Sequence, residues 1–362
     1  MENLGLSADF WAGKRVLVTG HSGFKGGWTC LMLSMLGAEV HGLSLPPTED
    51  SRFFMSVDLE NRISGSTYAD ITDYESCLGV IEKFNPDVIF HMAAQALVRA
   101  SYSSPVETYM TNVLGPVNIF EAARHVQSVK VIVNVTTDKC YKNNEWLWPY
   151  REDEALGGHD PYSSSKACSE IVSAAYRESF FKASSVQLAT ARAGNVIGGG
   201  DWSKDRLIPD ILRSLDANEV ITVRSPLAIR PWQHVLEPVS GYILLAQKLG
   251  ENKDLYDEAW NFGPEDNDCW SVEKIVTHVC RILKRGSWNS LDTDQPHEAG
   301  LLKLDSSKAK AKLGWLPRWK ISQALRKTLD WHQEFLSGAD MYDYSLEQIL
   351  EFQTDKKRYE SE

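Results

Sequence analysis

The chain lacks the segments that mark a membrane or nucleic-acid-binding protein. No apolar run approaches the ~18 residues needed to span a bilayer. Residues 1–11 are acidic and have no signal-peptide core. There is no basic tract, and the net charge is −11, which argues against nucleic acid as a partner. We therefore expect a cytoplasmic protein with neither a membrane nor a nucleic-acid partner.

Cysteine is scarce and unpaired in the sequence. The six cysteines are scattered, with no Cys-x-x-Cys pair. This pattern argues against a zinc site and favours a reducing compartment, so no metal is expected. The composition, 43% hydrophobic and 24% charged over 362 residues, suits a folded protein of one large domain or two.

Short apolar runs alternate with amphipathic stretches in the first half of the chain. We expect strands at 15–19, 39–43, 67–69, 87–91, 129–135 and 186–191, and helices at 24–36, 74–84, 106–124 and 162–181. Such alternation predicts an α/β fold, a Rossmann-type doubly wound sheet of parallel strands with helices on both faces.

After about Gly194 the elements become shorter and mixed, although 259–262 reads as a strand that returns to the sheet. We expect residues 1–195 to form a dinucleotide-binding domain that carries the catalytic residues. Residues 196–352 would form a smaller mixed α/β substrate lobe over the carboxyl ends of the strands, with some elements returning to the first domain. Residues 353–362 read as a charged, frayed tail.

A glycine-rich turn lies between the first strand and the first helix, with the sequence Gly20-His-Ser-Gly-Phe-Lys-Gly26. Glycines let the backbone approach a pyrophosphate, and the helix N-terminus favours its charge. The turn therefore predicts a dinucleotide cofactor. Lys25 within it either reaches a phosphate or stays solvated.

The acidic residue that would grip the adenosine ribose of NAD at the end of the second strand is missing. Its place falls near Ser44. Because no basic residue stands there either, NAD is favoured over NADP, although Arg52 follows closely in the sequence.

Tyr162 and Lys166 are four residues apart on a predicted helix that begins at Asp160-Pro161. They share one face of that helix. A nearby ammonium favours the phenolate and would lower the tyrosine pKa. Such a pair suits removal of a hydroxyl proton while hydride leaves the same carbon for the cofactor.

Several spaced motifs occur together in the first 200 residues: Gly20 to Gly26, Asp70-Ile71, His91-Met-Ala-Ala-Gln95, Asn112, Thr136-Thr-Asp138, Tyr162-x-x-x-Lys166 and Arg192-x-Gly-Asn195. In this order the chain resembles the extended short-chain dehydrogenase/reductases, in the branch that acts on nucleotide sugars. Gly20 to Trp28 and Val135 to Tyr141 are most similar to the CDP-glucose 4,6-dehydratases within it.

The resemblance implies NAD as cofactor, with Asp70 and Ile71 at the adenine and Ala93 and Ala94 beneath it. The implied cofactor-binding set is Gly20, His21, Gly23, Phe24, Lys25, Gly26, Asp70, Ile71, Ala93, Ala94, Gln95, Asn112, Tyr162 and Lys166. The implied substrate-binding set is Gln95, Asn195, Arg206 and Arg230, with Asn195 and Arg230 at the diphosphate. Asp70 as a turn carboxylate and Asn195 as a loop cap are the alternatives. We expect His91 to be a packed strand-end residue.

The resemblance also implies five catalytic residues: Thr137, Asp138, Lys139, Tyr162 and Lys166. Tyr162 would take the sugar C4 hydroxyl proton while Thr137 bonds the C4 oxygen. Asp138 would then protonate the departing C6 hydroxyl. Relatives acting on dTDP-glucose usually carry Glu where this chain has Lys139, so Lys139 either removes the C5 proton or stays charged and stabilises the enolate.

The expected activity is NAD-dependent conversion of CDP-glucose to the 4-keto-6-deoxy sugar nucleotide, which serves deoxyhexose synthesis for bacterial surface polysaccharide such as O-antigen. A 4-epimerase or ketoreductase of the same family and a non-catalytic dinucleotide-binding sensor are the alternatives. The resemblance implies a homodimer, or a dimer of dimers, that packs through helices 106–124 and 162–181.

Overall fold

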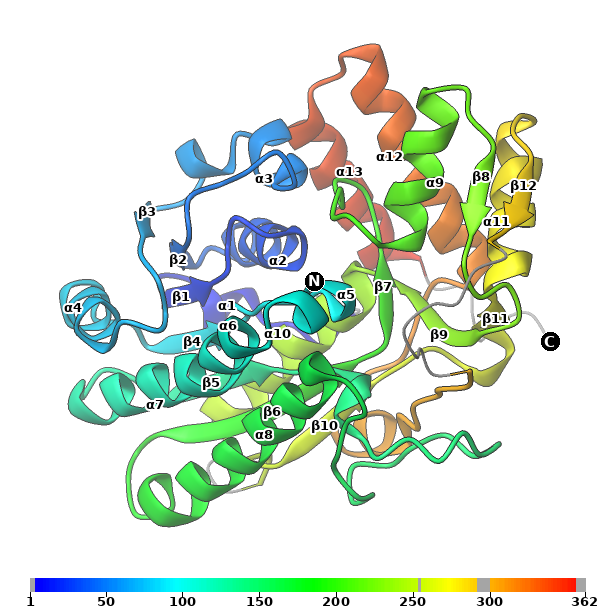
Figure 1. Ribbon diagram of the computed structural model, residues 1–362. Coiled ribbons are helices and arrows are strands. Elements are labelled where there is room, and N and C mark those ends of the chain that lie inside the picture. Colours follow the sequence, from blue (N-terminus) through cyan, green and yellow to red (C-terminus); the bar gives the residue numbers. More distant parts are fainter. Residues whose placement is uncertain (1–3, 253–254, 292–299, 356–362) are drawn as a thin grey trace.

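The computed structural model describes residues 4–252, 255–291 and 300–355. Its centre is a sheet of seven parallel strands in the order β10-β6-β5-β4-β1-β2-β3 (Figure 1). The order reverses between β1 and β4, which opens a crevice at the carboxyl ends of these two strands. The strands are β1 Arg15–Thr19, β2 Glu39–Ser44, β3 Gly65–Tyr68, β4 Val88–His91, β5 Val131–Val135, β6 Gln187–Ala193 and β10 Ala259–Phe262.

Helices cover both faces of this sheet. Along β1, Val16 and Val18 belong to one buried core whereas Leu17 belongs to another, because successive side chains point to opposite faces. The first core is closed by α2 (Phe24–Met35) and α10 (Leu236–Glu251), the second by α4 (Tyr74–Phe84), α7 (Gly115–His125) and α8 (Pro161–Tyr176). The predicted Rossmann-type doubly wound fold is confirmed.

The long helix expected over 106–124 is present but interrupted. It consists of α6 (Pro105–Tyr109), a π-helical turn η3 (Met110–Leu114) and α7, and α8 likewise runs on into a π turn η5 (Arg177–Phe181). π turns are frequent at functional sites, and η3 carries the predicted site residue Asn112. Short elements that the sequence did not signal are α1 Ala8–Trp11, α3 Arg52–Ser56, η2 Leu59–Asn61, α5 Val98–Ser103 and η4 Asp138–Cys140.

The second half of the chain forms smaller sheets and helices beside the carboxyl ends of the main strands (Figure 1). The three-stranded sheet is β11 (Cys269–Ser271), β9 (Ile229–His234) and β7 (Asn195–Ile197); the two-stranded sheet is β12 (Trp288–Ser290) with β8 (Ile221–Val223). The other elements are α9 Leu207–Asp216, η6 Asp266–Asp268, α11 Val272–Leu283, η7 Ala309–Leu313, α12 Ile321–Ser337 and α13 Met341–Thr354.

Two elements of this half return to the main sheet. Strand β10 pairs with β6 as predicted, and α10, which the sequence did not signal, packs on β5 and β6. Trp331 and Phe352 of the last two helices also join the core that contains Trp28 of α2. The mixed lobe is therefore interleaved with the first domain.

The predicted fraying from Gln353 is wrong for residues 353–355. Helix α13 continues to Thr354, Gln353 is buried, and the Asp355 carboxylate accepts a hydrogen bond from the Trp319 indole at 3.2 Å. The rest of the expected tail, 356–362, lies outside the described residues.

Among the described residues, no helix has the length and apolarity to cross a bilayer. Within the same ranges, no group of three or more His, Cys, Asp or Glu is placed to hold a metal ion.

Candidate active site

The crevice between β1 and β4 is closed at its base by the side chain of Thr19. Its hydroxyl oxygen accepts the backbone N–H groups of Met92 and Ala93 at 3.0 and 3.1 Å, so its own proton points to His91 Nδ1 at 2.9 Å. Burial lowers the pKa of His91 to about 3 and keeps the ring neutral. His91 is thus a packed strand-end residue, as expected.

The glycine-rich turn above this crevice leaves no room for a side chain at Gly20 or Gly26. Gly20 has φ +73°, and a Cβ there would lie 2.8 Å from the Ala93 nitrogen. A Cβ on Gly26 would overlap the Gly20 carbonyl. Gly23 stands at the N-cap of α2, whose first N–H groups have no partner within the helix. A close backbone turn at a helix N-terminus fits the pyrophosphate of a dinucleotide.

The side chains of His21 and Phe24, both in the predicted cofactor set, point into the protein. His21 Nε2 bonds Ser66 Oγ at 3.0 Å between β2 and β3, and burial lowers the pKa of His21 to about 4. Phe24 is buried in the first core. These two side chains therefore support the turn from within the protein core.

At the expected adenosine end, Asp70 is exposed and its Oδ1 accepts the Thr72 N–H at 2.8 Å, as a turn carboxylate does. The Ile71 side chain packs in the second core, and its carbonyl accepts the Asn118 amide at 2.9 Å. Both residues follow β3 at the carboxyl edge of the sheet, and their contact with the adenine stays a prediction.

Ser44 ends β2 in the place of the missing acid. Its hydroxyl donates to Ser22 Oγ at 2.9 Å. Arg52, the residue that kept NADP open as a cofactor, stacks on Trp202 with its guanidinium carbon 3.2 Å from the ring centroid. The Arg52 guanidinium thus makes a cation–π contact with Trp202.

The turn η4 follows β5 and carries three of the predicted catalytic residues. Thr137 caps it: its Oγ1 accepts the Lys139 N–H at 3.3 Å and donates to Asp138 Oδ1 at 3.1 Å. Asp138 is 1% exposed, and its Oδ2 has no hydrogen-bond partner within the described structure. Burial raises the pKa of Asp138, against the opposing charge of Lys139. This carboxyl is suited to hold a proton and donate it.

Helix α8 begins as predicted, with the Asp160 carboxylate accepting the Ser163 N–H at 2.9 Å and Pro161 in the first turn. Tyr162 is buried, and burial raises its pKa to about 12, opposed by a hydrogen bond with Thr137. Lys166 donates to the Val135 carbonyl at 3.2 Å; burial lowers the pKa of Lys166 to about 8, opposed by Glu170.

The expectation that Lys166 lowers the pKa of Tyr162 stays a prediction, because other groups have the larger effects on that pKa within the protein itself. The Lys166 ammonium is directed to the end of β5, and burial outweighs every favourable contact of the phenol. The neighbours that favour the phenolate are Thr137 and, after it, Arg206.

A cavity of about 770 Å³ joins these groups to the second half of the chain, a volume typical of small-molecule sites. Eight of the predicted site residues line it: Lys25, Thr137, Asp138, Lys139, Tyr162, Asn195, Arg206 and Arg230. The predicted site residues that meet at this cavity come from six separate segments of the chain.

Two arginines and an amide give this cavity its polar character. Arg206 pairs with Asp201 at 3.1 Å, and the buried Arg230 donates to the Ile229 carbonyl at 3.0 Å. The Asn195 Oδ1 atom is buried with no hydrogen-bond partner in the described part of the chain, which does not support the loop-cap alternative.

Lys25, expected at the cofactor, also lines this cavity. Burial, together with the charges of Arg206 and Lys166, lowers the pKa of Lys25 to about 7. It therefore stands on the side of the glycine turn that faces the catalytic groups.

Gln95 and Asn112 do not line the cavity. The Gln95 amide donates to the Leu97 carbonyl at 3.1 Å and to the Thr108 hydroxyl at 3.0 Å. The Asn112 amide donates to Ser165 of α8 at 2.9 Å and exchanges hydrogen bonds with the Gln95 backbone. The Asn112 side chain thus links the loop after β4, which also carries Ala93 and Ala94, to α8, and the Gln95 side chain links it to Thr108 of α6.

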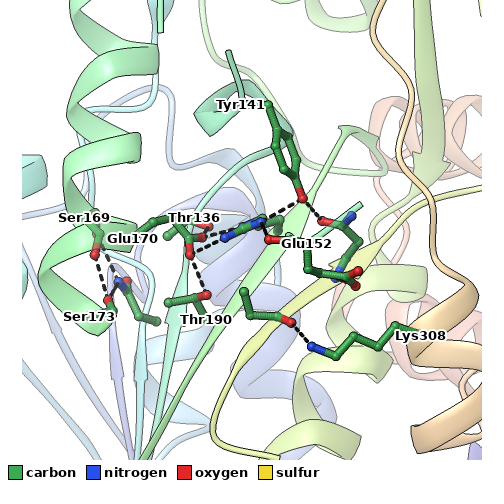
Figure 2. A network of polar contacts seen from close by, with 12 residues as sticks. Thr136, Tyr141, Glu152, Ser169, Glu170, Ser173, Thr190 and Lys308 are labelled. Carbon is green, nitrogen blue, oxygen red and sulfur yellow. Dashed lines mark hydrogen bonds and ion pairs between the residues drawn. The ribbon is translucent and has the colours of Figure 1, made fainter. Parts of the chain in front are cut away.

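A buried polar network behind the cavity was not predicted (Figure 2). Its centre is an ion pair between Glu170 of α8 and Arg192 of β6, both 3% exposed at their side chains. The available signal was a charged residue inside an otherwise uncharged strand, together with a carboxylate one helical turn after Lys166.

Comparisons with known proteins match most of the chain. The model of the GDP-mannose 4,6-dehydratase family matches residues 17–328. A CDP-glucose 4,6-dehydratase from Salmonella typhimurium is 49% identical over 96% of this chain and 98% of its own length. A dTDP-glucose 4,6-dehydratase from Xanthomonas campestris is 24% identical over 92% of this chain and 98% of its own.

Solved structures share the fold. An epimerase from Methanothermobacter thermautotrophicus superposes with a TM-score of 0.80 at 22% identity, covering 93% of this chain and 96% of its own. A dTDP-glucose 4,6-dehydratase from Streptomyces venezuelae, solved with NAD bound, gives 0.77 at 22% identity over 90% and 98%. From the family match and the 49% identity, this chain belongs to the GDP-mannose 4,6-dehydratase family.

Proposed function

We propose that this protein is an NAD-dependent CDP-glucose 4,6-dehydratase that converts CDP-glucose to CDP-4-keto-6-deoxyglucose and water. The observation that carries the proposal is the carboxyl group of Asp138, which presents an unpartnered buried oxygen in the same cavity as Tyr162. An elimination needs such an acid, whereas a 4-epimerase does not. The choice of CDP-glucose is supported by the 49% identical relative.

The crevice residues fit NAD. The turn at Gly20 and Gly26 would receive the pyrophosphate, the backbone after β3 the adenine, and the loop at Ala93 the underside of the cofactor. When bound there, NAD supplies a reversible hydride acceptor. The order reversal between β1 and β4 supports a cofactor site beside the cavity that holds Tyr162.

The residues of the cavity divide the remaining work. Tyr162 takes the proton of the sugar C4 hydroxyl, and Thr137 orients the C4 oxygen through the same hydrogen-bonded cluster. Asp138 donates a proton to the leaving C6 hydroxyl. Lys139 removes the C5 proton or, as a cation, stabilises the enolate. Arg206, Arg230 and Asn195 bind the diphosphate from the cavity wall.

A panel of CDP-, dTDP-, UDP- and GDP-glucose with the purified protein and NAD tests the proposal. A dehydratase develops the ultraviolet absorbance that a 4-ketosugar shows in alkali, without net NADH. We expect this signal with CDP-glucose above all. A 4-epimerised sugar, net NADH, or a preference for another base would overturn the proposal or its choice of nucleotide.

We also propose a homodimer, alone or as half of a dimer of dimers, built on α6, η3 and α8. Val106 is 75% exposed, and Met110, Leu114 and Ile171 add further exposed apolar surface on these packed elements. On α8, Ala167 packs inward against Tyr141, while Ala174 and Ala175 are exposed and allow close packing. Val106→Asp should give the 40.7 kDa monomer in sedimentation. Leu227→Asp, at an equally exposed site elsewhere, should leave the dimer intact.

A cytoplasmic location and a role in making deoxyhexoses for surface polysaccharide complete the proposal. All six cysteines are free thiols, as is typical of a reducing compartment.

A further inference from the structure

The Glu170 carboxylate joins three elements behind the catalytic cavity (Figure 2). It accepts Nε and Nη2 of Arg192 at 2.9 and 2.8 Å, the Thr190 hydroxyl at 2.7 Å, and the Thr136 hydroxyl. Glu170 lies on α8, Thr190 and Arg192 on β6, and Thr136 directly after β5. Four hydrogen bonds thus satisfy one buried carboxylate. Burial alone would raise the pKa of Glu170, but Arg192 and the Thr136 and Thr190 hydroxyls together outweigh it, so that the pKa is lowered.

Arg192 extends the same network to the far end of η4. Its Nη1 donates to the Tyr141 hydroxyl at 2.8 Å, and that hydroxyl donates to Asn261 of β10 at 2.7 Å. Tyr141 is fully buried and directly follows η4. The turn that carries Thr137, Asp138 and Lys139 is therefore held at both ends: at Thr136 by Glu170, and at Tyr141 by Arg192.

The buried ion pair between Glu170 and Arg192 is not expected to add much to stability. Buried ion pairs lose much of their attraction to desolvation, and apolar replacements of similar volume are often as stable. What the pair gives is a fixed geometry, because a bidentate guanidinium and carboxylate define both distance and orientation. The second contact of α8, from Lys166 to the Val135 carbonyl, lies one helical turn away from Glu170.

We propose that Glu170, Arg192 and Tyr141 are positioning residues that set the η4 turn against α8, so that Asp138 and Lys139 meet the sugar that Tyr162 and Lys166 oxidise. The inference rests on the proposed function. Its consequence is that oxidation at C4 and elimination of water depend on different parts of the structure. Tyr162 and Lys166 are fixed by α8 itself, whereas Lys139 and Asp138 depend on the network at the end of their turn.

Tyr141→Phe tests this division, because it removes only the hydroxyl that links Arg192 to Asn261. Thr190→Val is the matched control, since it removes one buried hydroxyl from Glu170 on the side away from η4. Single turnovers of CDP-glucose with bound NAD would follow NADH absorbance for oxidation at C4 and ketosugar formation for elimination. Thermal melting would report stability.

In Tyr141→Phe we expect oxidation within about twofold of the wild type and elimination slowed roughly 10- to 100-fold, so that NADH accumulates. In Thr190→Val the two rates should keep their wild-type ratio. Equal slowing of both steps in Tyr141→Phe, or the same NADH accumulation in Thr190→Val, would overturn the positioning role. If the wild-type protein makes no ketosugar from CDP-glucose, the proposed function fails instead.

Discussion

The Thr137 hydroxyl donates a hydrogen bond to Oδ1 of Asp138 at 3.1 Å, which leaves Oδ2 as the unpartnered oxygen of that carboxyl in the described structure. A carboxyl that accepts at one oxygen carries its proton on the other. Burial raises the pKa of Asp138, so this carboxyl takes up a proton more readily than an exposed aspartate does. Thr137 also favours the phenolate of Tyr162 by opposing the effect of burial on its pKa, so one threonine acts on both the base for oxidation and the acid for elimination.

Asp138→Asn should separate these two roles. The amide keeps a similar shape but cannot give up a proton, so we expect elimination to fall by roughly 10²–10⁴-fold while C4 oxidation continues. Stopped-flow absorbance of NADH after mixing with CDP-glucose should show a burst that decays slowly. Turnover close to the wild-type rate would mean that water or another group supplies the proton.

Lys139→Met should retain oxidation at C4 but lose exchange of the C5 hydrogen with solvent, if Lys139 is the base. The thioether preserves side-chain length without a proton acceptor. The measurement is deuterium uptake at C5 in heavy water by mass spectrometry. Uptake at the wild-type rate would instead assign Lys139 to stabilising the enolate as a cation.

Ser44→Asp should strengthen NAD binding. The serine ends β2 where related folds place the acid that binds the adenosine ribose, and a charged hydrogen bond there is worth roughly 1.5–3 kcal/mol, which corresponds to about tenfold or more in Kd. Calorimetric titration with NAD measures the change, and Ser44→Asn, which lacks the charge, is the control. An unchanged Kd would show that the ribose is held elsewhere.

Acid should destabilise the fold through three buried histidines. Burial lowers the pKa of His21 to about 4 and those of His91 and His234 to about 3, and each ring is at most 1% exposed. The unfolded chain therefore binds these protons first, and stability falls as pH drops below about 6.5. The loss approaches about 1.4 kcal/mol per pH unit for each ring.

Urea unfolding between pH 7 and 5 measures this slope. His91→Gln should reduce the slope of the unfolding free energy against pH by the equivalent of about one bound proton. Asn118→Ala removes a buried amide that does not titrate, so it should lower stability without changing this slope. A wild-type slope equal to that of His91→Gln would contradict the account.

The sequence was sufficient for the main sheet because its strands are local apolar runs, as in Val131–Val135. Motif spacing likewise placed Thr137, Asp138, Lys139 and Tyr162 at one cavity, since the carboxyl ends of parallel strands share an edge. The position of helix α10 was not predicted, because its packing on β5 and β6 depends on contacts between segments far apart in the chain.

The electrostatics of the site could not be predicted from the sequence either, because they depend on contacts between segments far apart in the chain. Four-residue spacing puts Tyr162 and Lys166 on one face, yet the ammonium is directed by the Val135 carbonyl and by Glu170. The role of Lys25 in the cavity wall and the link from Arg192 to Tyr141 also depend on segments distant in the chain.

The most direct test of the proposed dehydration follows one hydrogen. CDP-glucose labelled with deuterium at C4 would be turned over with NAD, and the product examined by NMR and mass spectrometry. Internal oxidation, elimination and reduction predict that the label moves to the C6 methyl group within one molecule, with no net NADH. A label that remains at C4 in an epimerised sugar, or that leaves with NADH, would contradict the account.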